Sequence, residues 1–103
     1  MNFEDNAAEA PQVFTLFQNA PNPLNPATTI SFALRKPSQV SLKVYDLLGR
    51  EVITLTEGDT PAGQHRVVWN GSDNRGKQVS SGVYLYRLIA SGKEVTRKML
   101  LAR

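Results

Sequence analysis

The segment TTISFAL, Thr28–Leu34, alternates apolar side chains with small or polar ones. Ile30, Phe32 and Leu34 point to one side of an extended chain, and the residues between them point to the other. A period of two with β-branched and aromatic residues predicts a β-strand that is buried on one face. This strand is the starting point for the fold.

The same alternation continues on both sides of this strand. After the turn residues KPSQ, the segment VSLKVYDL directs Val40, Leu42 and Val44 to one side. A loop is expected over Thr56–Gln64, and a hairpin is expected across Ser91–Lys93. The segments expected to be strands are Val13–Phe17, Thr28–Leu34, Val40–Leu47, Glu51–Leu55, His65–Asn70, Val83–Ala90 and Glu94–Leu101.

No segment has the apolar stripe and capping residues of a helix. Short strands separated by frequent turn residues are typical of a β-sandwich. We therefore predict an all-β fold, an Ig-like or fibronectin-like antiparallel sandwich of about seven strands. Its predicted core residues are Phe17, Ile30, Phe32, Leu34, Val40, Leu42, Val44, Val67, Trp69, Tyr84, Tyr86 and Leu88.

The segment QNAPNPLNP, Gln18–Pro26, precedes the first clear strand and contains three prolines. Proline has no backbone N–H and holds the residue before it in extended geometry. Such a segment cannot pair in the middle of a sheet. We expect an extended connector between strands or along an edge.

The length of 103 residues indicates one domain, which we place at residues 13–103. The chain has no cysteine, which excludes disulfides and thiolate metal sites. Residues 1–12 lack the basic and apolar regions of a signal peptide, and we expect a disordered linker or terminal tail there. No apolar run approaches the roughly 20 residues of a membrane helix, so no membrane insertion is expected.

The formal net charge is +3 and the sequence pI is about 9.5. Residues 1–12 carry three acids and no base, whereas the remainder carries twelve bases and six acids, a net charge of +6. The bases are dispersed as on solvated strand faces, with no basic block or nucleic-acid motif. Nucleic-acid binding is therefore not expected.

The sequence offers little chemistry. The only histidine, His65, opens a strand and has no adjacent acid to orient it, so a strand-edge histidine packed against its neighbours is favoured over a general base. We expect no enzyme activity and no cofactor. Asp73 and Asn74 are weak calcium candidates, but their loop departs from EF-hand spacing and favours turn chemistry. Otherwise no metal site is expected.

Aromatic residues on alternating strands could form a sugar-binding platform or belong to the core. The four candidates are Trp69, Tyr45, Tyr84 and Tyr86. Because each buries a large apolar area, the core interpretation is favoured.

Four segments, in this order and spacing, resemble the type A C-terminal sorting domain of the type IX secretion system. They are FTLFQNAPNPLNPATTISFAL, VSLKVYDLLGREV, AGQHRVVWNGSDNRGKQVSSGVYLYRL and TRKMLLAR. They are also similar to the Ig-like domain of flagellar hook-capping proteins, a close sequence relative. The resemblance runs from Phe14 to Arg103.

The resemblance implies that the domain serves as a secretion signal for an attached protein. In that family the domain ends a cargo protein of Bacteroidetes-type bacteria, and the outer-membrane translocon recognises it. A sortase often removes it, here in the linker before Val13 if cleavage occurs. The implied partners are the translocon, the sortase and an N-terminal cargo domain. The implied location is secreted or on the cell surface, after export through the periplasm, and we expect a monomer.

The matching residues are carried over position by position. They are Pro21, Asn22, Pro23, Asn25 and Pro26 in the first motif, Tyr45, Asp46, Gly49, Arg50, Glu51 and Val52 in the central hairpin, and Gly82, Val83 and Tyr84 in the late strand. The basic–apolar last strand matches at Arg97, Lys98, Met99 and Leu100. Leu24 departs from the family, where phenylalanine is commoner, as does Asn70, where aspartate is.

Recognition is expected at the last strand. If that strand is an edge, its unpaired main-chain groups can meet a partner. Arg97 and Lys98 would then steer the approach, and Met99, Leu100 and Leu101 complete the candidate recognition set, with Met99 and Leu101 as apolar anchors.

Two other functions remain open. One is a carbohydrate-binding or adhesive Ig-like module, which sugar binding would support. The other is a hook-cap-like assembly domain, which would act by self-association and is usually internal to its protein. The sequence stops two residues after the last expected strand, an arrangement that favours sorting.

Overall fold

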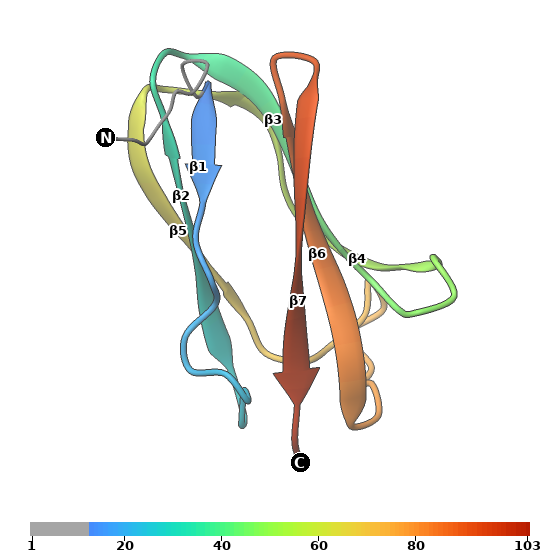
Figure 1. Cartoon of the computed structure of the whole chain (residues 1–103). Helices are drawn as coiled ribbons and strands as arrows, with labels where there is room; N and C mark the ends of the chain where they lie inside the picture. The colour runs from blue at the N-terminus through green and yellow to red at the C-terminus, as the bar shows by residue number, and fades with distance from the viewer. Residues whose placement is uncertain (1–12) are drawn as a thin grey trace.

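The computed structural model describes residues 13–103, so the linker expected over residues 1–12 lies outside the described residues. Seven strands account for all the regular secondary structure of the described part (Figure 1). They are β1 (Phe14–Leu16), β2 (Thr28–Leu34), β3 (Ser38–Tyr45), β4 (Glu51–Thr60), β5 (Gly63–Trp69), β6 (Gly82–Ala90) and β7 (Lys93–Leu101). The predicted all-β fold is confirmed, and no helix that could cross a membrane occurs in this range.

The strands form two antiparallel sheets that face each other across the core. The smaller sheet has the order β1-β2-β5, and the larger has the order β4-β3-β6-β7. The segment from which the fold was inferred, β2, is the central strand of the smaller sheet. It buries alternate residues, as its sequence predicts. This is the architecture of an Ig-like sandwich.

The core differs from the prediction mainly in β1. Phe17 was expected inside but is 41% exposed, whereas Phe14 and Leu16 are buried. In the antiparallel register, Phe14 lies opposite Leu34 and Leu16 opposite Phe32. Residues directly opposite each other share a face of the sheet, so the pairing with β2 turns the even-numbered residues of β1 inward.

The other predicted core residues are buried, except for Val67, which is half-buried against the cluster. Several buried apolar residues were not predicted. They are Phe14, Leu16, Leu24, Ala90, Met99 and Leu101.

The expected loop over Thr56–Gln64 is mostly strand. β4 continues to Thr60 because it pairs with β3 along its length, with Ser38 opposite Thr60 and Val40 opposite Gly58. Main-chain pairing thus overrides a polar, glycine-containing sequence. Gly58 itself has a φ of +123°, which a residue with a Cβ rarely adopts.

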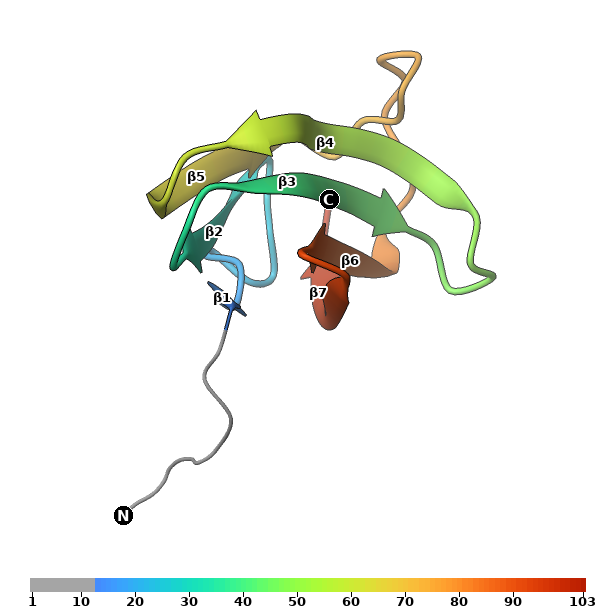
Figure 2. The ribbon, with the colours of Figure 1, turned by 90° about the horizontal axis from the view of Figure 1, so that it is seen from above.

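The hairpin between β3 and β4 turns earlier than expected, so that Leu47 belongs to the turn and not to the strand. Seen from above, β3 and β4 extend together beyond the rest of the sandwich and end in this turn (Figure 2).

Candidate functional site

The last strand, β7, lies at the edge of the larger sheet and pairs on one side only, with β6. The register is continuous from the pair Gly82–Leu101 to the pair Ala90–Lys93. An edge strand presents main-chain N–H and C=O groups that can pair with another chain. The expectation that the last strand is an edge is confirmed.

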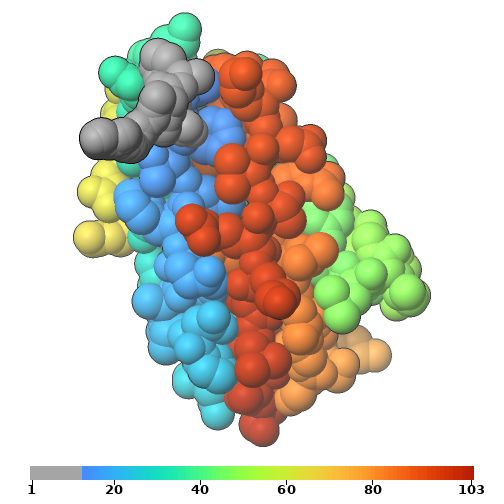
Figure 3. Space-filling view, in the orientation of Figure 1, coloured from blue at the N-terminus to red at the C-terminus, as the bar shows by residue number. Residues whose placement is uncertain are grey.

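The segment Gln18–Pro26, here called the proline strap, runs beside the C-terminal half of β7 (Figure 3). The N–H of Leu24 donates to the C=O of Leu100 at 2.9 Å, and the N–H of Ala102 donates to the C=O of Leu24 at 3.2 Å. The N–H of Leu100 donates to Oδ1 of Asn22 at 3.0 Å. The strap therefore forms hydrogen bonds with the main-chain N–H and C=O groups at the C-terminal end of this sheet edge.

The prolines keep the strap out of the seven strands, as expected, but one of its residues still pairs with β7. Leu24 forms an isolated parallel bridge with Leu101. It can do so because Leu24, unlike the prolines of the strap, has a backbone N–H, and this N–H points toward β7. The peptide bonds before Pro21, Pro23 and Pro26 are cis.

The side chain of Leu24 anchors the strap. It is 0% exposed and belongs to the same buried cluster as the strand residues. A single large apolar residue among prolines and asparagines was the available sequence signal for this role. In the sequence, Leu24 stood out only as a departure from the family pattern, in which phenylalanine is commoner at this position.

A buried polar network fixes the start of the strap. Nδ2 of Asn19 donates to Oγ1 of Thr28 at 3.0 Å and to the C=O of Pro21 at 3.2 Å. The hydroxyl of Thr28 also donates to the C=O of Pro21, at 2.8 Å. Asn19 and Thr28 are both buried. Because buried polar groups are costly unless paired, this network commits the strap to one path.

Tyr86 of β6 links the strap to the larger sheet. Its hydroxyl accepts the N–H of Asn19 and donates to the C=O of Phe17, both at 2.8 Å. Burial raises the pKa of Tyr86 above its ordinary value of 10.0, although the hydrogen bond from Asn19 opposes the shift. Burial therefore favours the neutral form of the phenol.

Two side-chain hydrogen bonds connect β7 to β1 and to the first residue of the strap. Nε of Arg97 donates to the C=O of Leu16 in β1 at 2.7 Å. Nε2 of Gln18 donates to the C=O of Lys98 at 2.9 Å. β1 and β7 lie side by side as a result (Figures 1 and 3).

Arg103 ties the chain beyond β7 to the connection between β5 and β6. Its guanidinium donates to the C=O of Val79 at 2.7 Å and to the C=O of Gly71 at 2.9 Å. Gly71 has a φ of +81°, and a Cβ there would lie 2.7 Å from a guanidinium nitrogen of Arg103. The positive φ favours glycine at this position, and a Cβ would displace the Arg103 guanidinium from the C=O of Gly71.

The candidate recognition residues are divided between two faces of β7. Met99 and Leu101 are each 1% exposed, so the expectation that they serve as apolar anchors for a partner is wrong. Met99 lies opposite Tyr84 in the register, and both turn into the core. Arg97, Lys98 and Leu100 are exposed.

The N-terminal half of β7, Glu94–Arg97, is the accessible part of the edge. Leu100 points its N–H and C=O toward the strap. Main-chain direction in a strand alternates with a period of two, so Lys98, Thr96 and Glu94 point the same way. All residues from 94 to 98 are exposed. Gln18 of the strap occupies the C=O of Lys98, so the outward main-chain groups of Glu94 and Thr96 are the ones left available for pairing.

The central motif forms the tip of the β3–β4 hairpin. Oδ1 of Asp46 accepts the N–H of Leu48 at 3.0 Å and the N–H of Arg50 at 2.9 Å, and Oδ2 accepts Nε of Arg50 at 2.8 Å. Gly49 supplies a φ of +84°. The N–H of Arg50 is the main cause that lowers the pKa of Asp46 below its ordinary value.

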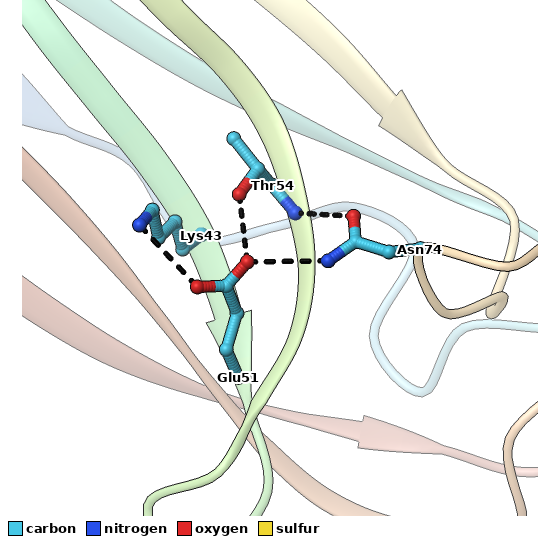
Figure 4. A network of polar contacts seen from close by, with 4 residues as sticks. All are labelled: Lys43, Glu51, Thr54 and Asn74. Atoms are coloured by element: carbon cyan, nitrogen blue, oxygen red, sulfur yellow. Dashed lines mark hydrogen bonds and ion pairs between the residues drawn. The ribbon is translucent and has the colours of Figure 1, made fainter.

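Glu51 connects the base of this hairpin to the loop after β5 (Figure 4). Oε2 of Glu51 accepts the hydroxyl of Thr54 at 2.8 Å and Nδ2 of Asn74 at 3.2 Å, while Oε1 pairs with Nζ of Lys43 at 3.3 Å. Oδ1 of Asn74 accepts the N–H of Thr54 at 3.1 Å. The bonds from Thr54, Asn74 and Lys43 lower the pKa of Glu51.

The weak calcium candidates are engaged in turn chemistry, as favoured from the sequence. Oδ1 of Asp73 accepts the N–H groups of Arg75 and Lys77 at 2.9 Å and 3.0 Å, and the N–H of Lys77 is the main cause that lowers the pKa of Asp73. Asn74 braces the hairpin as described above. Residues 13–103 contain no cluster of three acidic or histidine side chains suited to a metal.

These three carboxylates predict an acid-sensitive stability. The ordinary pKa is 4.5 for Glu51 and 3.8 for Asp46 and Asp73, and folding lowers the pKa of each carboxyl group. Each group therefore stabilises the folded state fully at a pH above its ordinary pKa, and this stabilisation is lost as the pH falls through its folded pKa. We expect the urea midpoint to be level above about pH 5 and to decline below it. Glu51→Gln should shallow this decline. An equally steep decline in the variant would contradict the role given to Glu51.

Most of the aromatic residues considered as a sugar-binding platform lie in the core, as the sequence favoured. Trp69, Tyr84 and Tyr86 are buried, whereas Tyr45 is half-buried with the Arg87 guanidinium 4.8 Å above its ring. The three buried rings cannot form a sugar-binding surface, which removes the basis of that alternative.

His65 is half-buried on β5, with its ring 5.2 Å from that of Phe32 and Nε2 2.7 Å from the C=O of Pro61. The packed strand-edge histidine is confirmed.

Comparison with known proteins gives one family match and several similar folds. The model of the FlgD Ig-like domain family matches residues 22–97. No curated protein matches the chain.

Three solved structures are informative. The dimeric latent PorU of Porphyromonas gingivalis superposes with a TM-score of 0.71 over 96% of this chain, at 22% identity, which shows a common fold. PorZ of the same organism, an essential surface component of its type IX secretion system, gives a TM-score of 0.60 over 85% of this chain, at 27% identity. FlgD from P. aeruginosa gives a TM-score of 0.57 over 73%, at 28% identity.

The chain spans about a tenth of the PorU and PorZ chains, 10% and 11%, and 60% of the FlgD chain. It therefore corresponds to one module of these proteins.

Proposed function

The chain belongs to the FlgD Ig-like domain family, and from this premise we propose that it is a non-catalytic sorting domain. In this role it directs an attached cargo protein across the outer membrane to the cell surface through the type IX secretion system. Its partners are the outer-membrane translocon, a sortase and the N-terminal cargo. The similarity to PorZ, a surface component of that system, supports this choice within the family.

The observation that carries the proposal is the half-open edge of β7. Glu94 and Thr96 turn their main-chain groups outward near the exposed basic side chains of Arg97 and Lys98, while the strap bonds to the C=O of Lys98 and closes the remainder. A strand of the translocon can pair with this segment, with the ladder giving affinity and the bases giving register and steering. Met99 and Leu101 contribute indirectly by fixing β7 in the core.

The test is a reporter with an N-terminal export signal, fused to this chain and expressed in a host with the secretion system. Thr96→Pro removes one outward N–H and leaves the β6 ladder intact, because the N–H of Thr96 faces away from β6. We expect the unchanged fusion to reach the surface and Thr96→Pro to lower its surface fraction at least severalfold. Protease shaving of intact cells measures the surface fraction.

Thr96→Ala is the matched control. It removes the same side chain, including the contact of Oγ1 with Nε of Arg87, but keeps the N–H. It should be exported normally. Equal export of both variants would refute recognition by edge pairing, and failure of the unchanged fusion to reach the surface would refute the sorting function.

A hook-cap-like assembly domain is the second candidate. It is favoured by the family model itself and by the 28% identity to FlgD. This function requires self-association, which sedimentation of the chain across a range of concentrations measures. A monomer at all concentrations argues for sorting, and a concentration-dependent oligomer argues for assembly.

A further inference from the structure

The β7 edge beside the strap carries unpaired positive charge. The carboxylate of Glu94 pairs with Nε of Arg87 at 3.7 Å. Arg97 and Lys98 are exposed, and neither belongs to an ion pair in the part of the chain that the structure describes. The accessible part of the edge therefore ends, next to the strap, in two uncompensated bases.

The strap obstructs antiparallel pairing between the β7 edges of two copies of the chain. Two such edges related by a two-fold axis must place their outward-pointing residues opposite each other. Centred on Thr96, the pairing would require the C=O of Lys98, which Gln18 occupies at 2.9 Å. It would also place Gly92 of the second copy opposite Leu100. The N–H and C=O of Leu100 are already bonded to the strap, so this register is blocked.

Charge opposes the two antiparallel registers that avoid the strap. A pairing centred on Val95 would place Lys93 opposite Arg97 at both ends of the ladder. A pairing centred on Glu94 would place two carboxylates opposite each other. Like charges directly opposite each other destabilise a pair of strands. The edge is therefore protected from a second copy and favours a strand of different sequence.

An extended acidic segment of another protein meets neither obstacle. It needs only the outward main-chain groups of Glu94 and Thr96, and it can end before it reaches the strap. In antiparallel pairing, which is slightly more stable per residue than parallel pairing, its N-terminal residues approach the strap. Acids at those positions would face Arg97 and Lys98, and opposite charges across a ladder are favourable. Val95, which is 37% exposed, favours an apolar residue opposite it.

We propose that the β7 edge binds an extended acidic segment of its protein partner, antiparallel to β7, with the N-terminal acids of that segment beside Arg97 and Lys98. The inference rests on the proposed sorting function and states the chemistry of the strand that the translocon contributes. The strap gives the site its limit, because it stops the incoming strand near Lys98 and blocks the register that a second copy would otherwise use.

The test titrates the whole chain with a synthetic peptide of two glutamates followed by threonine, valine and threonine. Both peptide ends are blocked, so that the side chains supply its only charges. In the amide NMR spectrum, the N–H signals of Glu94 and Thr96 should shift most, and the signal of Val68 in β5 should stay in place. A peptide with lysines in place of the glutamates should bind at least about fivefold more weakly.

Lys98→Glu tests the role of charge, and Lys36→Glu is its matched control. Both variants replace an exposed lysine with glutamate and change the net charge equally, but Lys36 lies between β2 and β3. Lys98→Glu should weaken binding of the acidic peptide at least about fivefold, whereas Lys36→Glu should bind it nearly as the unchanged chain does. The urea midpoints of both variants should stay the same, because both positions are exposed.

Several results would overturn the inference without touching the sorting function. They are equal weakening by the two variants, equally tight binding of the lysine peptide, and shifts that spare Glu94 and Thr96. Dimerisation of the unchanged chain in sedimentation, accompanied by shifts at Glu94 and Thr96, would replace the acidic segment with a second copy.

Surface export of the reporter fusion decides whether the translocon supplies the segment. Lys98→Glu should lower the surface fraction severalfold, and Lys36→Glu should not. Normal export of Lys98→Glu would overturn the assignment of the acidic strand to the translocon. If the unchanged fusion fails to reach the surface, the sorting function is refuted, and the peptide titration still decides separately whether the edge binds an acidic strand.

Discussion

Replacing Leu24 with alanine is expected to lower the free energy of unfolding by about 2–5 kcal/mol, the range for leucine-to-alanine changes in protein cores. The residue lies in the proline strap, outside the seven strands, yet its side chain is fully buried. The variant loses the buried methyl groups and leaves a cavity where the strap meets the core. Urea denaturation of the purified chain measures the loss.

Leu47→Ala is the matched control, because it is the same chemical change at an exposed position of the same chain. Its effect should stay within about 0.5 kcal/mol. If Leu24→Ala costs no more than this control, the strap is not anchored by its leucine.

The same variant should also loosen the sheet edge. The N–H of Ala102 donates to the C=O of Leu24, so detachment of the strap exposes that amide to water. Amide hydrogen exchange at Ala102 should accelerate more than exchange in the β3–β4 pairing, to which the strap makes no hydrogen bond in the described structure. Uniform acceleration would show global destabilisation instead of local release of the strap.

Tyr86→Phe is expected to lower the free energy of unfolding by about 1–3 kcal/mol, the cost of leaving a buried polar group unpaired. The phenylalanine ring fills the same space but removes the acceptor for the N–H of Asn19 and the donor for the C=O of Phe17. Urea denaturation near neutral pH measures the change. Tyr45→Phe, at the half-buried tyrosine beneath Arg87, is the control and should change little.

The pH dependence gives a second measurement on Tyr86→Phe. Because the folded pKa of Tyr86 is raised, its contribution is present below its ordinary value of 10.0 and is lost as the pH rises through the folded value. The variant should therefore lose less stability than the unchanged chain above about pH 10. An identical alkaline decline in both proteins would contradict the burial of this hydroxyl.

Local patterns were sufficient where a strand has one buried face and clear alternation. β2 was predicted with its observed ends, and the inward residues of β3 and, apart from Ala90, of β6 were identified correctly. The Asp73 loop was also predictable, because aspartate bonds to nearby main-chain N–H groups wherever a turn allows it.

Patterns failed where a residue's environment is set by a distant partner. Phe17 was assigned to the core because β1 is too short for its alternation to define a face, and the pairing with β2 decided the matter. Met99 and Leu101 were expected to be outward anchors because the sequence carries no sign of which side of β7 faces Tyr84. Thr56–Thr60 was expected to be loop because its partner, β3, lies elsewhere in the sequence.

The strap illustrates both sides of this division. Its prolines by themselves determined that it could not be a central strand, because proline lacks the N–H that a sheet ladder requires. Only the tertiary structure decided that it closes half of the β7 edge. That role depends on Leu24 and Asn22 meeting Leu100 and Ala102, residues nearly eighty positions away by sequence, as the separation of 78 between Asn22 and Leu100 shows. Every residue except proline has the same backbone N–H and C=O groups, so the sequence does not show which of these groups will pair with which. The sequence therefore determined where most of the strands lie, and the packing of distant segments determined which sheet edge remains open.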